Sequence, residues 1–354
     1  MKSLKKVMLV ALFAAIVFNP LSSAEPLKDI DPVKAESVRE YQEKALKGDP
    51  VFQVALGDCY IQGIGIAKDL KQAIFWYKKA ADQGSAAAQA RIGFGYLYAY
   101  GFDKNISEGL KWIRKSVEQN HPFGLLALAH CYFKGLGIEK NEAEGFKYVQ
   151  KAAELNNRHA VLQMANCYFD GVGVKQNEEE AIKWFKKAEQ MGSARAKLSL
   201  GLIKLKTGKQ DQVEEAVQLI QAAAEKGLPE AQYTLGNCFS KGLGVKEDAA
   251  TAVQWYRKAA EKDLPDAQYA LAECLVAGVG VEKEDKVLAA EWYKKAAELG
   301  DINAMIALAD CYYYGIGLKA DRNAAYQWYK NAADKGSELA KLIVQDIDEG
   351  VAAK

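Results

Sequence analysis

The chain has 354 residues, half of them hydrophobic and 26% charged, with only seven prolines. This composition provides enough apolar surface for a sizeable buried core and excludes global disorder. The 47 basic and 46 acidic residues nearly balance, so the net charge gives no long-range attraction for nucleic acid or anionic lipid.

The first residues have the pattern of a secretory signal peptide. A lysine-rich start over residues 2–6 precedes an apolar stretch over residues 7–18, which is short for a transmembrane helix of about 20 residues. Small residues then predict cleavage after Ala24, which leaves 44 basic against 46 acidic residues. We therefore expect a periplasmic or secreted protein without a membrane span. An uncleaved anchor or a buried helix is the alternative interpretation.

After this start, the chain repeats itself with a period of about 36 residues. One block reads Leu-Gly-x-Cys-Tyr from Leu56 and ends in Gly-x-Gly, and a second block reads Trp-Tyr-x-Lys-Ala-Ala from Trp76. All six tryptophans fall on one repeat position and all six cysteines on another, which chance cannot arrange. We predict eight repeats, over residues 48–83, 84–119, 120–155, 156–191, 192–226, 227–262, 263–299 and 300–335.

Each repeat has the periodicity of a helical hairpin. In the sixth repeat, apolar and small residues recur at helical spacing over residues 231–238 and again over residues 252–259. The glycine-containing break at residues 242–244 separates these two helices. Large residues such as Trp76 are expected to fill gaps between hairpins, because one hairpin cannot bury its apolar face alone. The predicted fold class is all-α, a right-handed α-α superhelix of hairpin repeats.

Both ends of the repeat array are expected to carry half-repeats. Residues 33–47 resemble a second helix and residues 337–348 a first helix, each with apolar residues on one side. The predicted organisation is therefore a signal peptide over residues 1–24, a leader with an N-terminal capping helix over 25–47, the repeats over 48–335, and a C-terminal capping helix and tail over 336–354.

The repeated pattern resembles that of the Sel1-like repeat family, a relative of the tetratricopeptide repeats with a longer hairpin loop. The resemblance covers residues 48–335 and is specific, because the motif recurs with fixed spacing. The second repeat departs from it at Ala99, where other repeats have glycine, and the fifth has Lys-Thr-Gly-Lys from Lys206 and no tryptophan. The resemblance implies an adaptor or scaffold. Its bacterial members are often exported and linked to envelope functions, signalling or contact with host cells.

The six cysteines are expected to be buried thiols and not disulfides. Equivalent positions on neighbouring helices lie about 8–10 Å apart, whereas a disulfide needs Cα atoms roughly 4.4–6.8 Å apart. A cysteine-rich branch of the resembled family carries disulfides, but with two cysteines per repeat, whereas this chain has one. This expectation conflicts with export, because thiols in an oxidising compartment commonly form disulfides.

Metal, cofactor and catalytic motifs are not expected. The three histidines lack metal-ligand spacing, and the Gly-x-Gly pairs join helix to helix, where no phosphate loop forms. Of the β-lactamase motifs, Ser-x-x-Lys occurs only at Ser3, Ser-Asp-Asn is absent, and Lys-Thr-Gly occurs at Lys206 without a nucleophile. We therefore predict a protein that is not an enzyme and that has no cofactor.

A groove is the remaining candidate site. In the tetratricopeptide relatives, first helices line the concave side, so the residue before each cysteine position is expected to point there. We call these residues the pre-cysteine row; it varies in size and charge where packing positions barely vary. A second candidate row comprises Val51, Ala87, Phe123, His159, Arg195, Glu230, Asp266 and Asn303. The pre-cysteine row comprises Asp58, Phe94, His130, Asn166, Leu202, Asn237, Glu273 and Asp310.

The favoured interpretation is an exported scaffold that binds a peptide or protein along this concave face. Asn166 and Asn237 are the best single candidates, because an amide can pair with both donor and acceptor groups of a peptide backbone. Ordinary solvated helix surface is the alternative interpretation of both rows. The alternative functions are a β-lactamase-like or cell-wall hydrolase and a self-associating envelope component.

Overall fold

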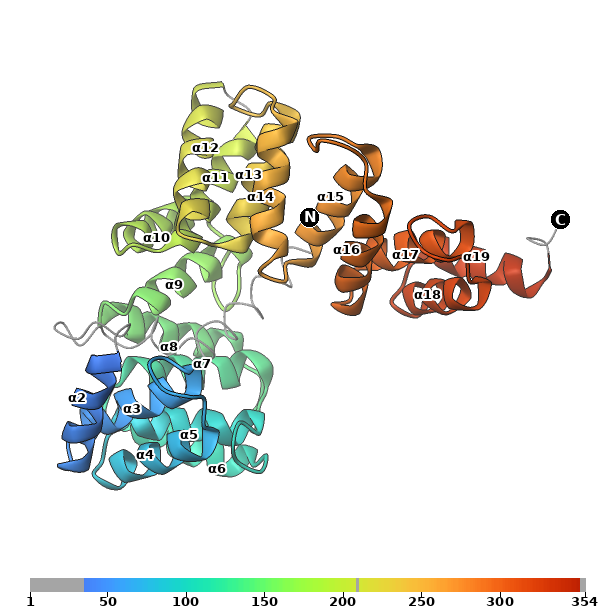
Figure 1. Ribbon diagram of the computed structural model, residues 1–354. Coiled ribbons are helices and arrows are strands. Elements are labelled where there is room, and N and C mark those ends of the chain that lie inside the picture. The colour runs from blue at the N-terminus through green and yellow to red at the C-terminus, as the bar shows by residue number, and fades with distance from the viewer. Residues whose placement is uncertain (1–34, 208–209, 351–354) are drawn as a thin grey trace. The chain divides into compact units, whose positions relative to one another are not determined.

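The computed structural model describes residues 35–207 and 210–350, and every regular element in these ranges is an α-helix (Figure 1). Consecutive helices pack in pairs, which confirms the predicted all-α repeat fold. The predicted signal peptide and most of the leader lie outside the described residues. The chain divides into two structural units between Ser193 and Ala194.

The first unit consists of one leading helix and four helical hairpins. The two helices of each hairpin pack against each other, and each second helix packs against the first helix of the following hairpin. The leading helix α2 packs on the first hairpin in the same way. The helices are α2 (Ala35–Leu46), α3 (Pro50–Gln62), α4 (Leu70–Asp82), α5 (Ala86–Tyr98), α6 (Ile106–Glu118), α7 (Pro122–Lys134), α8 (Glu142–Glu154), α9 (Arg158–Asp170) and α10 (Glu178–Gln190).

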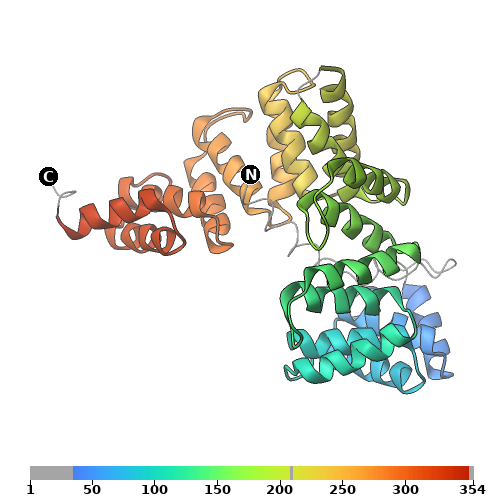
Figure 2. The same cartoon turned by 180° about the vertical axis from the view of Figure 1, so that it is seen from behind.

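The second unit repeats this arrangement with four hairpins and a final helix (Figure 2). The Lys-Thr-Gly-Lys break expected in the fifth repeat falls where α11 ends, and residues 208–209 are outside the described ranges. The helices are α11 (Ala194–Thr207), α12 (Gln210–Glu225), α13 (Pro229–Lys241), α14 (Ala249–Ala260), α15 (Pro265–Ala277), α16 (Lys286–Glu298), α17 (Ile302–Tyr314), α18 (Arg322–Asp334) and α19 (Glu338–Asp348).

Side-chain caps determine where the second helix of each hairpin begins. The carboxylate of Asp69 accepts the backbone N–H of Gln72 at 3.0 Å, which satisfies one of the free donors at the start of α4. An aspartate or asparagine caps each of six other second helices in the same way. These residues therefore set the register of the hairpins.

The two glycines of each hairpin loop have different roles. The first caps the first helix in a left-handed conformation; the Gly63 N–H, for example, donates to the Cys59 carbonyl oxygen at 2.8 Å. The second lets the loop touch the preceding hairpin: a Cβ on Gly317 would lie 1.9 Å from the carbonyl oxygen of Lys286. The second repeat has Ala99 in the first role, at φ 56°, and keeps Gly101 in the second.

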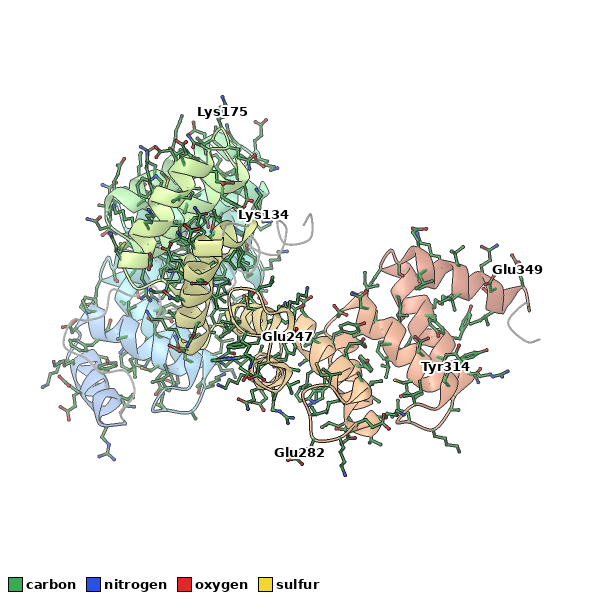
Figure 3. All side chains as sticks on the ribbon, turned by 90° about the horizontal axis from the view of Figure 1, so that it is seen from above. Lys134, Lys175, Glu247, Glu282, Tyr314 and Glu349 are labelled. Atoms are coloured by element: carbon green, nitrogen blue, oxygen red, sulfur yellow. The ribbon has the colours of Figure 1, made fainter. Side chains whose placement is uncertain are left out.

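Alanines, larger aliphatic residues, second-helix tyrosines and cysteines form the core, whereas most tryptophans lie at its edge. Trp76 is buried, but the other five rings are half-buried. A lysine three residues later often lies over the ring, as Lys258 does at 3.9 Å from the centre of Trp255, so its charge stays in water while its stem covers the ring. Charged residues such as Glu247 and Glu282 stand exposed on the hairpin loops (Figure 3).

Candidate functional site

The pre-cysteine row lies on the first helices and differs in exposure between the two units. In the first unit Asp58, Phe94, His130 and Asn166 are buried, with 1–8% of their surface exposed. In the second unit Leu202, Asn237 and Asp310 are half-buried and Glu273 is exposed. The row is therefore accessible chiefly in the second unit, and partner binding by its residues stays a prediction.

Polar members of the row hold the second helix of their own hairpin. The Tyr77 hydroxyl donates to Asp58 at 2.5 Å, and the Tyr256 hydroxyl donates to Asn237 at 2.8 Å. The Tyr293 and Tyr329 hydroxyls pair in the same way with Glu273 and Asp310. A buried tyrosine hydroxyl needs a hydrogen-bond partner, so each of these row residues has a structural role beside any binding role.

This pairing explains part of the variation that the sequence shows along the row. Where the second helix has Ile113 or Ile220 instead of tyrosine, the row residue of the same hairpin is Phe94 or Leu202. The sequence contains a signal for these four pairs. In each of them the tyrosine follows its acidic or amide partner by 19 or 20 residues. Variation within the row alone does not reveal this signal, because the tyrosine lies on the other helix of the hairpin.

A buried arginine, Arg91, contacts the row residue of the first hairpin. Arg91, on α5 of the next hairpin, donates from Nε and Nη2 to the two carboxylate oxygens of Asp58, both at 2.7 Å. The side chains are 10% and 2% exposed. The guanidinium carbon lies 5.9 Å from the centre of the Tyr77 ring and 5.7 Å from that of Phe123. The site is thus a guanidinium receptor built from a carboxylate and two rings.

His130 is a second buried polar member of the row. Its Nε2 pairs with the Tyr98 hydroxyl, and only 4% of the residue is exposed. Burial lowers the pKa of His130 from 6.5 to about 4, and the Lys134 ammonium lowers it further in the same direction. Burial, followed by the charge of Arg91, also lowers the pKa of His121 to about 4. Both imidazoles are therefore neutral at pH 7.

Acid is expected to destabilise the first unit through these histidines. An unfolded histidine binds its proton near pH 6.5, whereas folded His130 binds it near pH 4. The stability contribution is thus complete above pH 6.5 and is lost as the pH falls towards 4, by at most about 3 kcal/mol for His130. Urea unfolding at pH 7 and pH 4 measures this loss. His130→Gln should reduce the loss while His121 retains its share; an equal acid loss in variant and wild type would contradict the assignment.

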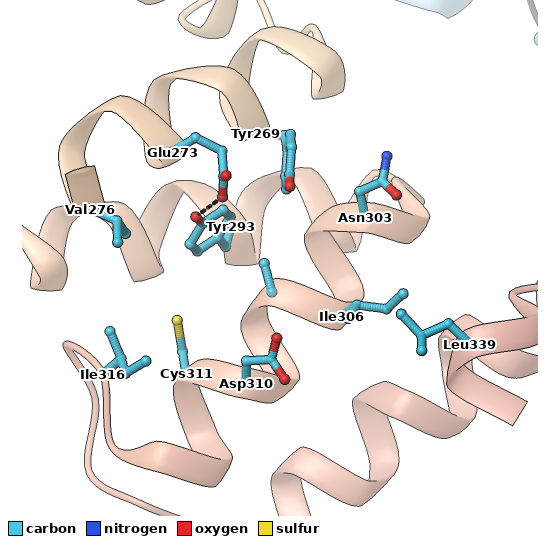
Figure 4. A pocket seen from close by; sticks show the side chains of 11 residues that line it. Tyr269, Glu273, Val276, Tyr293, Asn303, Ile306, Asp310, Cys311, Ile316 and Leu339 are labelled. Carbon is cyan, nitrogen blue, oxygen red and sulfur yellow. Dashed lines mark hydrogen bonds between the residues drawn. The ribbon is translucent and has the colours of Figure 1, made fainter. Parts of the chain in front are cut away.

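An open cavity of about 440 Å³ lies at the row in the second unit, between α15, α16, α17 and α19 (Figure 4). Its polar lining comes from Tyr269 and Glu273 on α15, Tyr293 on α16, and Asn303 and Asp310 on α17. Ile306, Ala307 and Leu339 are among its apolar lining residues. Aromatic rings beside carboxylates make this cavity suited to a cation that also has an apolar or planar part.

The cavity is negatively charged through the carboxylates of Glu273 and Asp310. Glu273 and Asp310 form no ion pair within the described residues. Burial, followed by the charge of Glu273, raises the pKa of Tyr269, and burial with the hydrogen bond to Glu273 raises that of Tyr293. The tyrosines therefore stay neutral, and the charge of the cavity comes from the carboxylates.

The second candidate row is more accessible than the first. Asp266 and Asn303 are exposed in the second unit, and Val51 is exposed in the first. Asn303 also lines the cavity, so the two predicted rows meet there. Partial burial of its carboxylate, followed by the charge of nearby Asp301, raises the pKa of Asp266.

The six cysteines are free thiols, of which Cys274 is half-buried and the others are buried. Burial raises the pKa of Cys131 and Cys167 to about 12, so neither thiol ionises at pH 7. Among the described residues, no group of three or more His, Cys, Asp or Glu side chains is placed to hold a metal ion. Within the same ranges no helix is both long enough and apolar enough to span a membrane.

Comparison with known proteins adds the following similarities. A crystal structure of a Sel1 repeat protein from Oxalobacter formigenes has 26% sequence identity and a TM-score of 0.60, with 87% of this chain and 89% of that chain covered. A protective antigen of uropathogenic Escherichia coli with an SLR fold has 29% identity and a TM-score of 0.44, with 89% and 75% covered. A search among curated proteins gave no match. The model of the Sel1 repeat matches residues 50–85, 86–121, 122–157, 158–193, 199–228, 229–264, 265–301 and 302–337.

Proposed function

The chain belongs to the Sel1 repeat family, and on this premise we propose that it is an exported, non-enzymatic scaffold that holds a peptide or protein partner against its first helices. Sel1 repeats form a scaffold fold typical of protein–protein interaction. Export rests on the basic, apolar and small-residue pattern of residues 1–24. The partner is a protein or peptide, because the near-zero net charge does not favour nucleic acid.

One observation carries the choice of binding surface. The cavity at the pre-cysteine row is the place where Glu273, Asp310 and the exposed Asn303 gather beside two tyrosine rings. Tyrosine supplies a large, rigid contact surface, and carboxylate and amide groups supply directional hydrogen bonds. Binding hot spots and their surroundings combine these two kinds of residue. The buried row of the first unit supplies stiffness for the same scaffold.

Site-specific photocrosslinking in the native host tests this proposal. A benzoylphenylalanine replaces Asn303 at the cavity, and in a matched variant it replaces Lys294, which is exposed on the second helix α16. We expect a crosslinked protein from the Asn303 position at a yield about fivefold above that from Lys294, because contact is closest where the partner buries most surface.

The identity of the crosslinked protein separates the alternatives. A different protein, found reproducibly at Asn303 and not at Lys294, supports the scaffold. Crosslinks between two copies of this chain favour the self-associating envelope component instead. Equal yields at the two positions, or no crosslink at either, would reject the binding surface.

A further inference from the structure

We infer that the cavity between α15, α16, α17 and α19 receives one arginine side chain of a bound peptide. The inference rests on the proposed scaffold function and names the chemistry of one contact. It is based on a comparison within the chain. At the junction of the first two hairpins, the equivalent place is occupied by the protein's own Arg91.

The two places correspond residue by residue when first helices are aligned from their first residue. Glu273 stands at the position of Asp58, the ninth of its helix, and Tyr293 at that of Tyr77. Leu339 on α19 stands where Phe123 stands on α7. Each carboxylate accepts the hydroxyl of its tyrosine, so the acceptor is oriented in the same manner in both places.

The two places differ at the arginine itself. The residue that corresponds to Arg91 is Ala307, the sixth residue of α17, and Ala307 lines the cavity. In the first unit the pocket lined by Arg91, Tyr77 and Phe123 has a volume of about 40 Å³, whereas the cavity at Ala307 has about 440 Å³. The second unit thus keeps the carboxylate and the tyrosine of the receptor, has Leu339 in place of Phe123, and lacks the side chain that fills it.

The charge of the cavity also favours a guanidinium from outside the chain. Asp310 stands at the position of Phe94, so this place has two carboxylates where the Arg91 site has one. Figure 4 shows Glu273 and Asp310 on two different helices, with Tyr269 to one side of Glu273. A planar guanidinium can pair with a carboxylate through two hydrogen bonds and stack on an aromatic ring, which an ammonium cannot do.

The preceding junction provides a matched control. There Ala270 corresponds to Arg91, so the side chain is again missing, but the row residue is the neutral Asn237, which accepts the Tyr256 hydroxyl. That place therefore lacks a carboxylate at the position of Asp58, although Glu273 stands there at the position of Phe94. The junction at Glu273 therefore lacks the arginine, because it has Ala307 instead, but retains a carboxylate at the position of Asp58.

Saturation-transfer NMR with a defined probe tests the inference on the full chain. The probe is acetyl-Gly-Ser-Arg-Ser-Gly-amide, and the control peptide has citrulline, a neutral isostere of arginine. With wild type, we expect transfer to the arginine side-chain protons at least about fivefold stronger than to citrulline, because the charged pair is lost in the latter. Ala307→Arg, which fills the cavity as Arg91 does, should reduce the arginine signal to the citrulline level.

Two further variants make the result decisive. Ala270→Arg should reduce the signal much less than Ala307→Arg, since it adds the same side chain at the junction where Asn237 stands in place of Asp58. Glu273→Gln with Asp310→Asn removes both charges but keeps acceptors for the tyrosines, and it should abolish the preference for arginine even if Ala307→Arg fails to fold. Equal signals for the two peptides with wild type, or an arginine preference that survives this double change, would overturn the inference.

The outcome is distinguishable from failure of the scaffold itself. Loss of the arginine preference together with a specific crosslink at Asn303 refutes the arginine receptor and leaves the scaffold. An arginine preference without any crosslinked partner retains the receptor and refutes the scaffold.

Discussion

Replacing Arg91 with alanine is expected to lower the free energy of unfolding of the first unit by about 3–5 kcal/mol. The reason is that Asp58 loses its ion-pair partner. Its side chain is 2% exposed, so a buried charge would remain with only the hydrogen bond from the Tyr77 hydroxyl. Urea unfolding of the full chain measures the loss, and hydrogen exchange of peptides from α3, α4 and α5 locates it.

Another junction of the chain shows which control variant to make. In the sixth hairpin Asn237 accepts the tyrosine hydroxyl and the following hairpin has Ala270 in place of arginine. Asp58→Asn combined with Arg91→Ala copies that arrangement, so the double variant should recover most of the stability lost in the single one. A double variant as unstable as Arg91→Ala, or a single variant within about 1 kcal/mol of wild type, would show that the buried charge does not govern this junction.

The fold was predictable from the sequence because the physical causes of each element repeat along the chain. Helical periodicity and paired glycines in the loops occur in repeat after repeat, and the structure confirms the hairpins that they predict. A pattern with many copies can be recognised without knowing any three-dimensional contact.

The candidate site was only partly predictable, because its decisive features do not repeat. Arg91 reaches Asp58 across 33 residues and has no counterpart in other repeats, so nothing in the repeated pattern predicts that Asp58 is buried. The cavity depends on a side chain that is missing, at Ala307, and comparison of polar residues cannot reveal an absence. The sequence placed Glu273 and Asp310 in one row, and the structure adds that they line one cavity with Asn303.

The pre-cysteine row has different surroundings in the two units. In the first unit the row is closed by the chain's own side chains, including the buried pair of Asp58 and Arg91 and the neutral His130. In the second unit the equivalent residues keep their tyrosine contacts but are open on one side. Repeats with one backbone geometry can therefore serve as rigid support at one place and as a receptor at another, depending on one residue of the neighbouring hairpin.

Replacing Gly317 with alanine is expected to destabilise the last hairpins by roughly 3–5 kcal/mol, whereas Gly315→Ala in the same loop should cost only about 1–2 kcal/mol. Both glycines have a left-handed backbone, at φ 68° and 70°, so the conformational cost of a side chain is alike. The difference is contact. A Cβ at Gly315 would meet its nearest neighbour at 3.5 Å, but at Gly317 it would lie 1.9 Å from the backbone oxygen of Lys286.

The second repeat already shows the milder substitution, since Ala99 occupies the first glycine position at φ 56° while Gly101 is retained. Urea unfolding of the two variants, with hydrogen exchange over α16 to α18, compares them directly. Equal destabilisation would mean that the loop relaxes away from α16 and that only backbone strain matters. A larger effect at Gly317 would establish that close approach of each loop to the preceding hairpin, and not turn geometry alone, is why the second glycine is kept even where the first is lost.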